Sequence, residues 1–191
     1  MAVRSPFPTG HRHTSRHPPD PTSPRRSGAL TGLAALNTAP PADAEAALTA
    51  CHGSHRWARR LAAHRPYPDL PALLAAADEA AYDLTPADLG EALAHEPAAR
   101  PPALPSLAAH TALRAAHAAY ESRFGHVFVL CLDAYEPAEH LDQLLAGIRT
   151  RLSHTPEQEH AVTAEELRKL ARGRLARLAR GRPMGIRVRQ G

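Results

Sequence analysis

Short amphipathic segments alternate along the chain with breaks made of proline and glycine, a pattern typical of an all-α protein. Apolar residues recur at intervals of three and four from about position 30 to about position 180. We expect helices over about 30–36, 42–50, 55–65, 70–81, 86–95, 107–124, 137–152 and 156–180. No internal repeat of fixed length is visible. The pattern therefore predicts a single-domain bundle of about seven or eight helices.

Several of these segments begin with a residue that can cap a helix. Ser54, Asp69 and Ser106 each precede an apolar-periodic stretch, and their side chains can accept a bond from a free backbone N–H. Thr85-Pro86-Ala87-Asp88 and Thr155-Pro156-Glu157-Gln158 add a proline at the first helical position and an acceptor three residues after the cap. These residues predict where the helices start.

The stretch from 117 to 132 joins two kinds of periodicity. Leu113, Tyr120 and Phe124 lie on one helix face, and Gly125 follows where a left-handed C-cap is often needed. Residues 127–132 are then apolar throughout and too few to span a membrane. Their backbone N–H and C=O groups must find partners inside the protein. Buried extended backbone next to a helix end is suitable material for a ligand pocket.

Composition divides the chain of 191 residues into one domain and two tails. Residues 1–28 are rich in Pro, Ser, His and Arg, so we expect them to be disordered. Residues 29–181 form the predicted helical domain, and residues 182–191 form a basic tail. Only Cys51 and Cys131 are present, without partner spacing for zinc or redox work, and no signal peptide precedes the domain. We expect a cytoplasmic protein with two buried, apolar cysteines.

The net charge of +4 is unevenly distributed. Residues 1–28 carry five Arg and one Asp, and residues 168–191 carry eight Arg and one Lys without any acid. Residues 29–167 are therefore net −9, which argues against a nucleic-acid face on the folded body. The basic C-terminus can contact phosphates, but cations in a last helical turn also complement the helix dipole.

Several segments together resemble a known family. They are Cys51-His52-Gly53-Ser54-His55-Arg56-Trp57-Ala58, Arg65-Pro66-Tyr67, His95, Tyr120-Glu121-Ser122-Arg123-Phe124-Gly125-His126-Val127-Phe128, Arg151-Leu152-Ser153-His154, Glu165-Glu166-Leu167 and Arg174-Leu175-Ala176-Arg177-Leu178. Over about residues 29–181 the chain resembles the 2-oxo-4-hydroxy-4-carboxy-5-ureidoimidazoline (OHCU) decarboxylase family, whose enzymes act last on the route from urate to allantoin. The Tyr-Glu-x-Arg-Phe-Gly-x-x-Phe stretch is the most specific part. The resemblance implies a homodimeric enzyme without a cofactor that decarboxylates a small ureidoimidazoline and yields (S)-allantoin.

The resemblance also implies a site. His95 matches the family's catalytic His, and an imidazole can act as general acid or base near neutral pH. In the family Pro follows this His directly, whereas Glu96 intervenes here. The residues that we expect to contact the substrate are Pro97, Ser106, His110, Phe128, Val129, Leu130, Cys131 and Leu132.

Other positions depart from the family. Ala109 stands where the family has a catalytic Glu, His110 stands in place of its Gln, and the preceding loop is shorter. Glu96 is the candidate substitute for the missing carboxylate. A second departure is a polar stripe that is either a pocket for an anion or a solvated helix face: His110, Arg114, His117 and Glu121, with His117 where the family has Asn.

Simpler interpretations stand beside these. His95 can be a partner of the helix dipole, and Arg123 has Glu121 and Asp133 as available acidic partners. The histidines of the N-terminal tail have no ligand spacing, so no metal site is predicted. Two further functions stay open: a member of the same fold that only binds a small molecule or dimerises, and a partner-binding protein that uses its basic C-terminus.

Overall fold

A computed structural model describes residues 32–181. This part consists of eight helices and has no strand, which confirms the predicted all-α class. The helices are α1 (Leu33–Thr38), α2 (Pro41–His52), α3 (His55–Ala63), α4 (Leu70–Tyr82), α5 (Pro86–His95), α6 (Leu107–Phe124), α7 (His140–Arg151) and α8 (Pro156–Ala179). The predicted tails, 1–28 and 182–191, lie outside the described residues.

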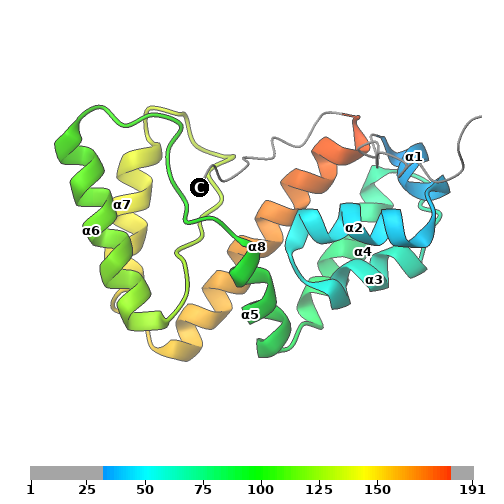
Figure 1. Cartoon of the computed structure of the whole chain (residues 1–191), viewed down its shortest axis with the longest axis horizontal. Helices are drawn as coiled ribbons and strands as arrows, with labels where there is room; N and C mark the ends of the chain where they lie inside the picture. The colour runs from blue at the N-terminus through cyan, green and yellow to red at the C-terminus, as the bar shows by residue number, and fades with distance from the viewer. Residues whose placement is uncertain (1–31, 182–191) are drawn as a thin grey trace, which may run out of the picture.

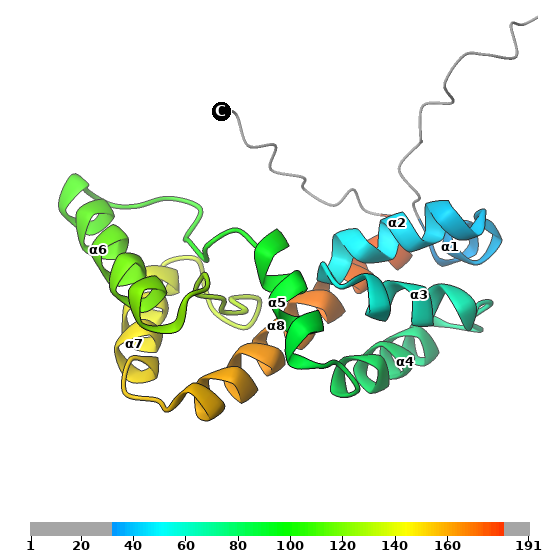
Figure 2. The same cartoon turned by 60° about the horizontal axis from the view of Figure 1, so that its bottom comes forward.

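The molecule is elongated, and its helices form two groups (Figures 1 and 2). Helices α1–α4 lie at one end and the α6–α7 pair lies at the other, while α5 lies between them. The long helix α8 connects the groups, because it starts near the α6–α7 pair and packs its later turns against α2 and α4. This arrangement puts the end of α5 in the middle of the molecule.

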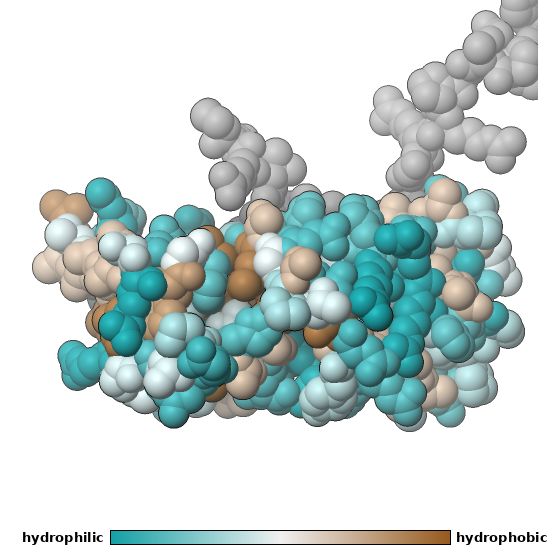
Figure 3. All heavy atoms as spheres, turned by 90° about the horizontal axis from the view of Figure 1, so that it is seen from below, coloured by the Kyte–Doolittle hydropathy of each residue, from teal (hydrophilic) through white to brown (hydrophobic). Residues whose placement is uncertain are grey.

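Each group has its own apolar core. Leu48, Trp57, Leu73 and Leu175 are buried together where α2, α3 and α4 meet α8. A second core lies between α6 and α7 and includes Leu113, Tyr120, Phe128, Leu144 and Ile148. A smaller cluster joins α5 to α8 through Leu89, Leu93 and Leu167. Seen from below, the most hydrophobic atoms at the surface lie mainly toward the α6–α7 side, and the α1–α4 side is mostly hydrophilic (Figure 3).

The predicted helix starts are confirmed by the caps that form. The Ser54 hydroxyl accepts from the Trp57 N–H at 3.3 Å, Asp69 accepts from the Ala72 N–H at 2.8 Å, and Ser106 accepts from the Ala109 N–H at 3.1 Å. Both predicted capping boxes, at Thr85 and Thr155, are present. The start of α7 was predicted wrongly, because a turn closed by the Glu139 N–H on the Glu136 carbonyl precedes it.

None of the helices within residues 32–181 is both long and apolar enough to cross a lipid bilayer.

Candidate active site

His95 is the last residue of α5, and its side chain is exposed. Its Nδ1 lies 2.9 Å from the carbonyl oxygen of Glu91, one turn back in the same helix. A carbonyl only accepts, so Nδ1 carries the proton in this bond and Nε2 is left with its lone pair. The helix thus selects the tautomer of His95 and leaves Nε2 open for proton transfer.

The turn between α2 and α3 positions the end of α5. Gly53 has φ +91°, and a Cβ built there would lie 2.9 Å from the Ala92 carbonyl oxygen and 3.2 Å from the His95 Cβ. Only glycine combines this backbone conformation with so close an approach. The His55 N–H, at the start of α3, donates to the Glu91 carboxylate at 3.1 Å. The segment around Gly53 therefore positions His95, a role that the sequence reading missed although it noted the motif.

Glu96, next to His95, is buried and held by Arg174 of α8. The Arg174 Nη2 donates to the Glu96 Oε2 at 2.7 Å, and its Nη1 contacts both Oε1 and, at 3.1 Å, the Cys51 carbonyl. Burial lowers the pKa of Arg174, but the Glu96 carboxylate raises it further, so the net shift is upward. Both carboxylate oxygens of Glu96 are thus engaged, which argues against the hypothesis that Glu96 replaces the missing catalytic Glu.

The segment from Phe128 to Leu132 is irregular, and four of its five residues have one backbone group with a hydrogen-bond partner. The Phe128 carbonyl accepts from the Ala99 N–H at 3.0 Å, and the Val129 carbonyl accepts from Arg151 at 2.7 Å. The Cys131 N–H donates to the Glu166 carboxylate at 2.7 Å, and the Leu132 carbonyl accepts from the Tyr135 N–H.

The backbone amide of Leu130 is different. Its N–H and C=O have no hydrogen-bond partner within residues 32–181. Within residues 32–181, only four of the ten backbone N–H and C=O groups of residues 128–132 have a hydrogen-bond partner, so the predicted requirement for internal partners was wrong for most of these groups.

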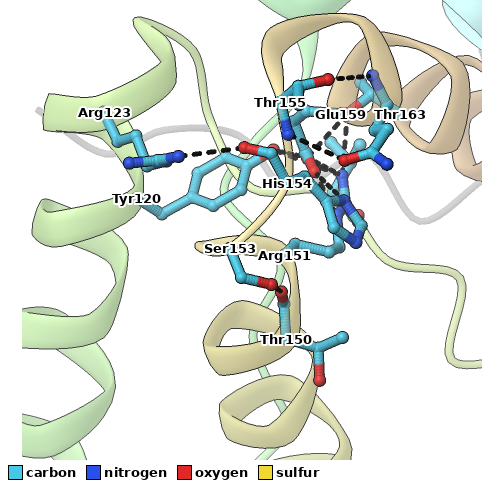
Figure 4. Close-up of polar contacts among 11 residues, drawn as sticks. Tyr120, Arg123, Thr150, Arg151, Ser153, His154, Thr155, Glu159 and Thr163 are labelled. Atoms are coloured by element: carbon cyan, nitrogen blue, oxygen red, sulfur yellow. Dashed lines mark hydrogen bonds and ion pairs between the residues drawn. The ribbon is translucent and has the colours of Figure 1, made fainter.

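A buried polar cluster connects the long helices (Figure 4). The Tyr120 hydroxyl donates to the Glu159 carboxylate, which also accepts from the Arg151 Nε at 2.9 Å. Burial raises the pKa of Tyr120, and the Glu159 carboxylate adds to this shift. The Arg151 guanidinium also lies 4.6 Å from the centre of the Phe128 ring. These contacts join α6, α7 and α8 behind the Phe128 segment.

The Tyr-Glu-x-Arg-Phe-Gly motif, which begins with Tyr120, also defines the end of α6. The Arg123 Nη2 donates to the His154 carbonyl at 3.0 Å, and Arg123 forms no ion pair within residues 32–181 with Glu121 or Asp133, the partners of the simpler interpretation. Gly125 follows as the C-cap with φ +76°. The Tyr-Glu-x-Arg-Phe-Gly stretch therefore has a structural role: it fixes where the chain turns into the Phe128 segment.

The comparisons with known proteins agree with this architecture. The family model described as OHCU decarboxylase matches residues 37–100 and 103–176, well over half of the chain. The chain belongs to the OHCU decarboxylase family. A comparison with curated proteins gives no match.

Two solved structures share the fold. The crystal structure of (S)-allantoin synthase aligns with a TM-score of 0.62 at 23% identity, over 76% of this chain and 53% of that chain. This chain thus spans about half the length of that protein. The crystal structure of an OHCU decarboxylase in the presence of (S)-allantoin aligns with a TM-score of 0.59 at 22% identity, over 69% of this chain and 95% of that chain.

The residues predicted for the site are only partly brought together. Ser106 is exposed and uses its hydroxyl to cap α6, and Ala109 provides no carboxylate. Pro97 is exposed at the start of the loop whose Ala99 binds Phe128. His110 lines one of the two cavities described below, whereas His95 lines neither of them.

Two cavities lie in the described part of the molecule. The first, of about 740 Å³, is lined by α5, the end of α6 and the first turns of α8, and it includes Ala94 and Glu96. The second, of about 450 Å³, lies between residues 98–104 and α6, where His110 lines it. Within residues 32–181 no group of three or more His, Cys, Asp or Glu side chains is arranged to hold a metal ion.

Proposed function

We propose that this family member catalyses the cofactor-free decarboxylation of 2-oxo-4-hydroxy-4-carboxy-5-ureidoimidazoline to (S)-allantoin, with His95 as general acid and base. The match over 37–100 and 103–176 supports a decarboxylase. The observation that carries the assignment of His95 is its bond to the Glu91 carbonyl, which fixes the ring and leaves Nε2 open.

The proposed reaction needs a proton donor and a group that accepts the electron pair of the broken carbon–carbon bond. As the bond to the carboxylate carbon breaks, its electron pair passes into the conjugated ring of the substrate and carbon dioxide leaves. A proton then goes to the ring carbon from one face, which sets the S configuration. In this proposal His95 Nε2, protonated before the step, supplies that proton, as a positioned general acid does.

The remaining predicted contacts would bind the substrate along the loop. Pro97 begins the loop, Ala99 joins it to Phe128, and the open amide of Leu130 offers one donor and one acceptor for a ureido group. Phe128, Val129, Cys131 and Leu132 would form the wall beside it, and Ser106 and His110 would close the site from α6. Donors fixed on the backbone need no reorganisation during the reaction.

A second function is favoured because no carboxylate within residues 32–181 is available to assist His95. Ala109 removes the family's Glu, and both oxygens of Glu96 are bound by Arg174. His95 therefore has no carboxylate hydrogen-bonded to it among the described residues. The alternative is a member that keeps the scaffold and binds a small molecule, or dimerises, without catalysis.

The test uses substrate made freshly from urate by urate oxidase and hydroxyisourate hydrolase, with (S)-allantoin followed by circular dichroism. We expect wild type to accelerate its formation and His95→Ala to lose about a hundred- to ten-thousand-fold in rate. His64→Ala is a matched control, because His64 is also exposed at a helix end with Nδ1 on the carbonyl one turn back, Arg60.

The outcomes separate the two functions. A wild-type protein without effect on the rate or chirality of allantoin formation would favour the second function. A His95→Ala variant as fast as wild type, in an active protein, would remove the assignment of His95.

Assembly and location belong to the same proposal. We expect a homodimer, as the family resemblance implies, which light scattering of the purified full chain would test. A cytoplasmic location is supported by the low cysteine content, two in 191 residues, because proteins of oxidising compartments are commonly richer in cysteine. The acidic body, net −9 over residues 29–167, argues against nucleic acid as the partner.

A further inference from the structure

The second cavity has basic residues on both of its walls, the loop and α6. It lies between the proline-rich residues 98–104 and α6, and its charged or titratable lining residues are Arg100, His110, Arg114 and His117. No Asp or Glu side chain lines this cavity. The first cavity, by contrast, includes both Glu96 and Glu159.

The guanidinium groups at this cavity lack counterions. Neither Arg100 nor Arg114 makes a hydrogen bond or an ion pair with any residue of the described chain. Arg168 and Arg174, in the same structure, each bind a carboxylate through two nitrogen–oxygen contacts. Two unpaired cations that face one hollow raise its positive potential and favour an anion there.

His117 contributes buried polar atoms to the cavity. Its two ring nitrogens are buried, and neither makes a hydrogen bond of good geometry within residues 32–181, although the Ala99 backbone lies nearby. The ring packs edge-on against Phe128, with centroids 6.0 Å apart. Burial lowers the pKa of His117, while Ala99 and the Glu121 carboxylate oppose that shift. Buried polar atoms without partners are costly, and an acceptor in the cavity would offset this cost.

The remaining walls are apolar and stiff. Three of the lining residues are Pro101, Pro102 and Leu104, and α6 adds Leu113. Proline fixes the backbone torsion φ, so the loop loses little conformational freedom when a ligand binds. A volume of about 450 Å³ is in the range of small-molecule sites.

We propose that this cavity is a binding site for a small organic anion, a carboxylate or a phosphate ester, held by Arg100, Arg114 and His110 above the His117 ring. The cavity does not include His95, although it shares His110 and Ala99 with the proposed catalytic site, and binding of an anion there requires no proton transfer. The inference therefore does not depend on the decarboxylase activity.

The experiment titrates the full-length protein with inorganic phosphate and, separately, with benzoate. Binding is followed by the imidazole nitrogen–proton NMR signals of the histidines and by calorimetry at low ionic strength. We expect saturable binding of at least one probe, with shifts at His110 and His117. Arg114→Gln should weaken this binding about tenfold or more, because it removes a charged donor to the anion.

Two controls make the result specific. Arg149→Gln removes an exposed arginine of α7 that does not line the cavity, and it should leave the affinity unchanged. His95→Ala should also bind the probe normally, whatever its effect on decarboxylation. Stronger binding of benzoate would identify carboxylates as the preferred class, and stronger binding of phosphate would identify phosphate esters.

Absence of saturable binding by either probe would overturn the proposal. Equal affinities of Arg114→Gln and wild type would do so as well, since the anion would then lie elsewhere. Arg114 is exposed, and folding of the variant is checked by its circular dichroism before titration.

Discussion

Arg174 binds the carboxylate of Glu96 through both of its Nη atoms, with 2.7 Å between Nη2 and Oε2. The pair joins α8 to the residue that follows His95. The Glu96 side chain is only 5% exposed and that of Arg174 only 22% exposed. Because water reaches these two charges poorly, each is stabilised mainly by the other.

Loss of one partner of this pair should be costly. Glu96→Gln leaves the Arg174 guanidinium largely buried without a counterion, and we expect the free energy of unfolding to fall by about 2–4 kcal/mol. Urea denaturation at pH 7 measures this. Asp83→Asn is the control, because Asp83 pairs with Arg60 at the exposed surface and should cost less than about 1 kcal/mol. Similar losses in both variants would contradict the buried-pair interpretation.

The close approach at Gly53 predicts opposite effects for two glycines. The Cβ that Gly53→Ala adds would lie 2.9 Å from the Ala92 carbonyl oxygen, and the backbone at position 53 has φ +91°, which alanine rarely adopts. We therefore expect the variant to lower the free energy of unfolding by about 2 kcal/mol or more. Gly90→Ala lies inside α5 with no atom within 4 Å of the added Cβ, and it should stabilise by about 0.5–1 kcal/mol. Thermal unfolding of both variants tests the pair. A stabilised Gly53→Ala would show that the turn does not pack on the end of α5.

Tyr120 should contribute mainly to stability. Tyr120→Phe removes the hydroxyl that donates to Glu159 and that accepts from Arg151 at 3.2 Å, and we expect a loss of about 1.5–3 kcal/mol. Tyr135→Phe, at a side chain that is 40% exposed, should change stability by less than about 0.5 kcal/mol. The comparison is made by urea denaturation, and a harmless Tyr120→Phe would mean that the cluster in Figure 4 adds no stability.

His52 should make stability depend on pH. Burial, followed by the charge of Arg174, lowers the pKa of His52 from 6.5 to about 4. Between these two values the unfolded chain binds a proton that the folded chain excludes. The free energy of unfolding is therefore unaffected by protonation of His52 above pH 6.5. It falls as the pH falls below 6.5, by about 2 kcal/mol between pH 6.5 and 5.

His52→Phe should remove this pH dependence. In the wild type the centroids of the His52 and Trp57 rings are 4.9 Å apart, and the phenyl ring would keep this stacking without a titrating group. Denaturation at pH 7, 6 and 5 should show a much flatter profile for His52→Phe. His64→Phe, at an exposed position, should keep the wild-type slope. A wild-type slope in His52→Phe would show that other groups cause the acid sensitivity.

Local sequence determined most of the helical architecture. Caps such as Ser54, Asp69 and Thr85 act within one turn of the chain, so their effect can be read from neighbouring residues. The α7 start was missed because residues 136–139 form a turn, in which the Glu139 N–H donates to the Glu136 carbonyl and the Glu136 N–H donates to the Glu139 carboxylate. Apolar periodicity also identified the correct core face of α6, including Tyr120.

Sequence alone gave the family resemblance, the all-α class, the helix starts and His95 as the end of α5, because each depends on residues close together in the chain. Only the tertiary structure decided what the polar groups face. In the folded chain Glu96 pairs with Arg174, 78 residues away, and the Tyr120 hydroxyl donates to Glu159, 39 residues away. It also grouped Arg100 with Arg114 and His117 around one cavity. Such partners are fixed by how helices pack over long separations, and no periodicity within a single helix records that packing.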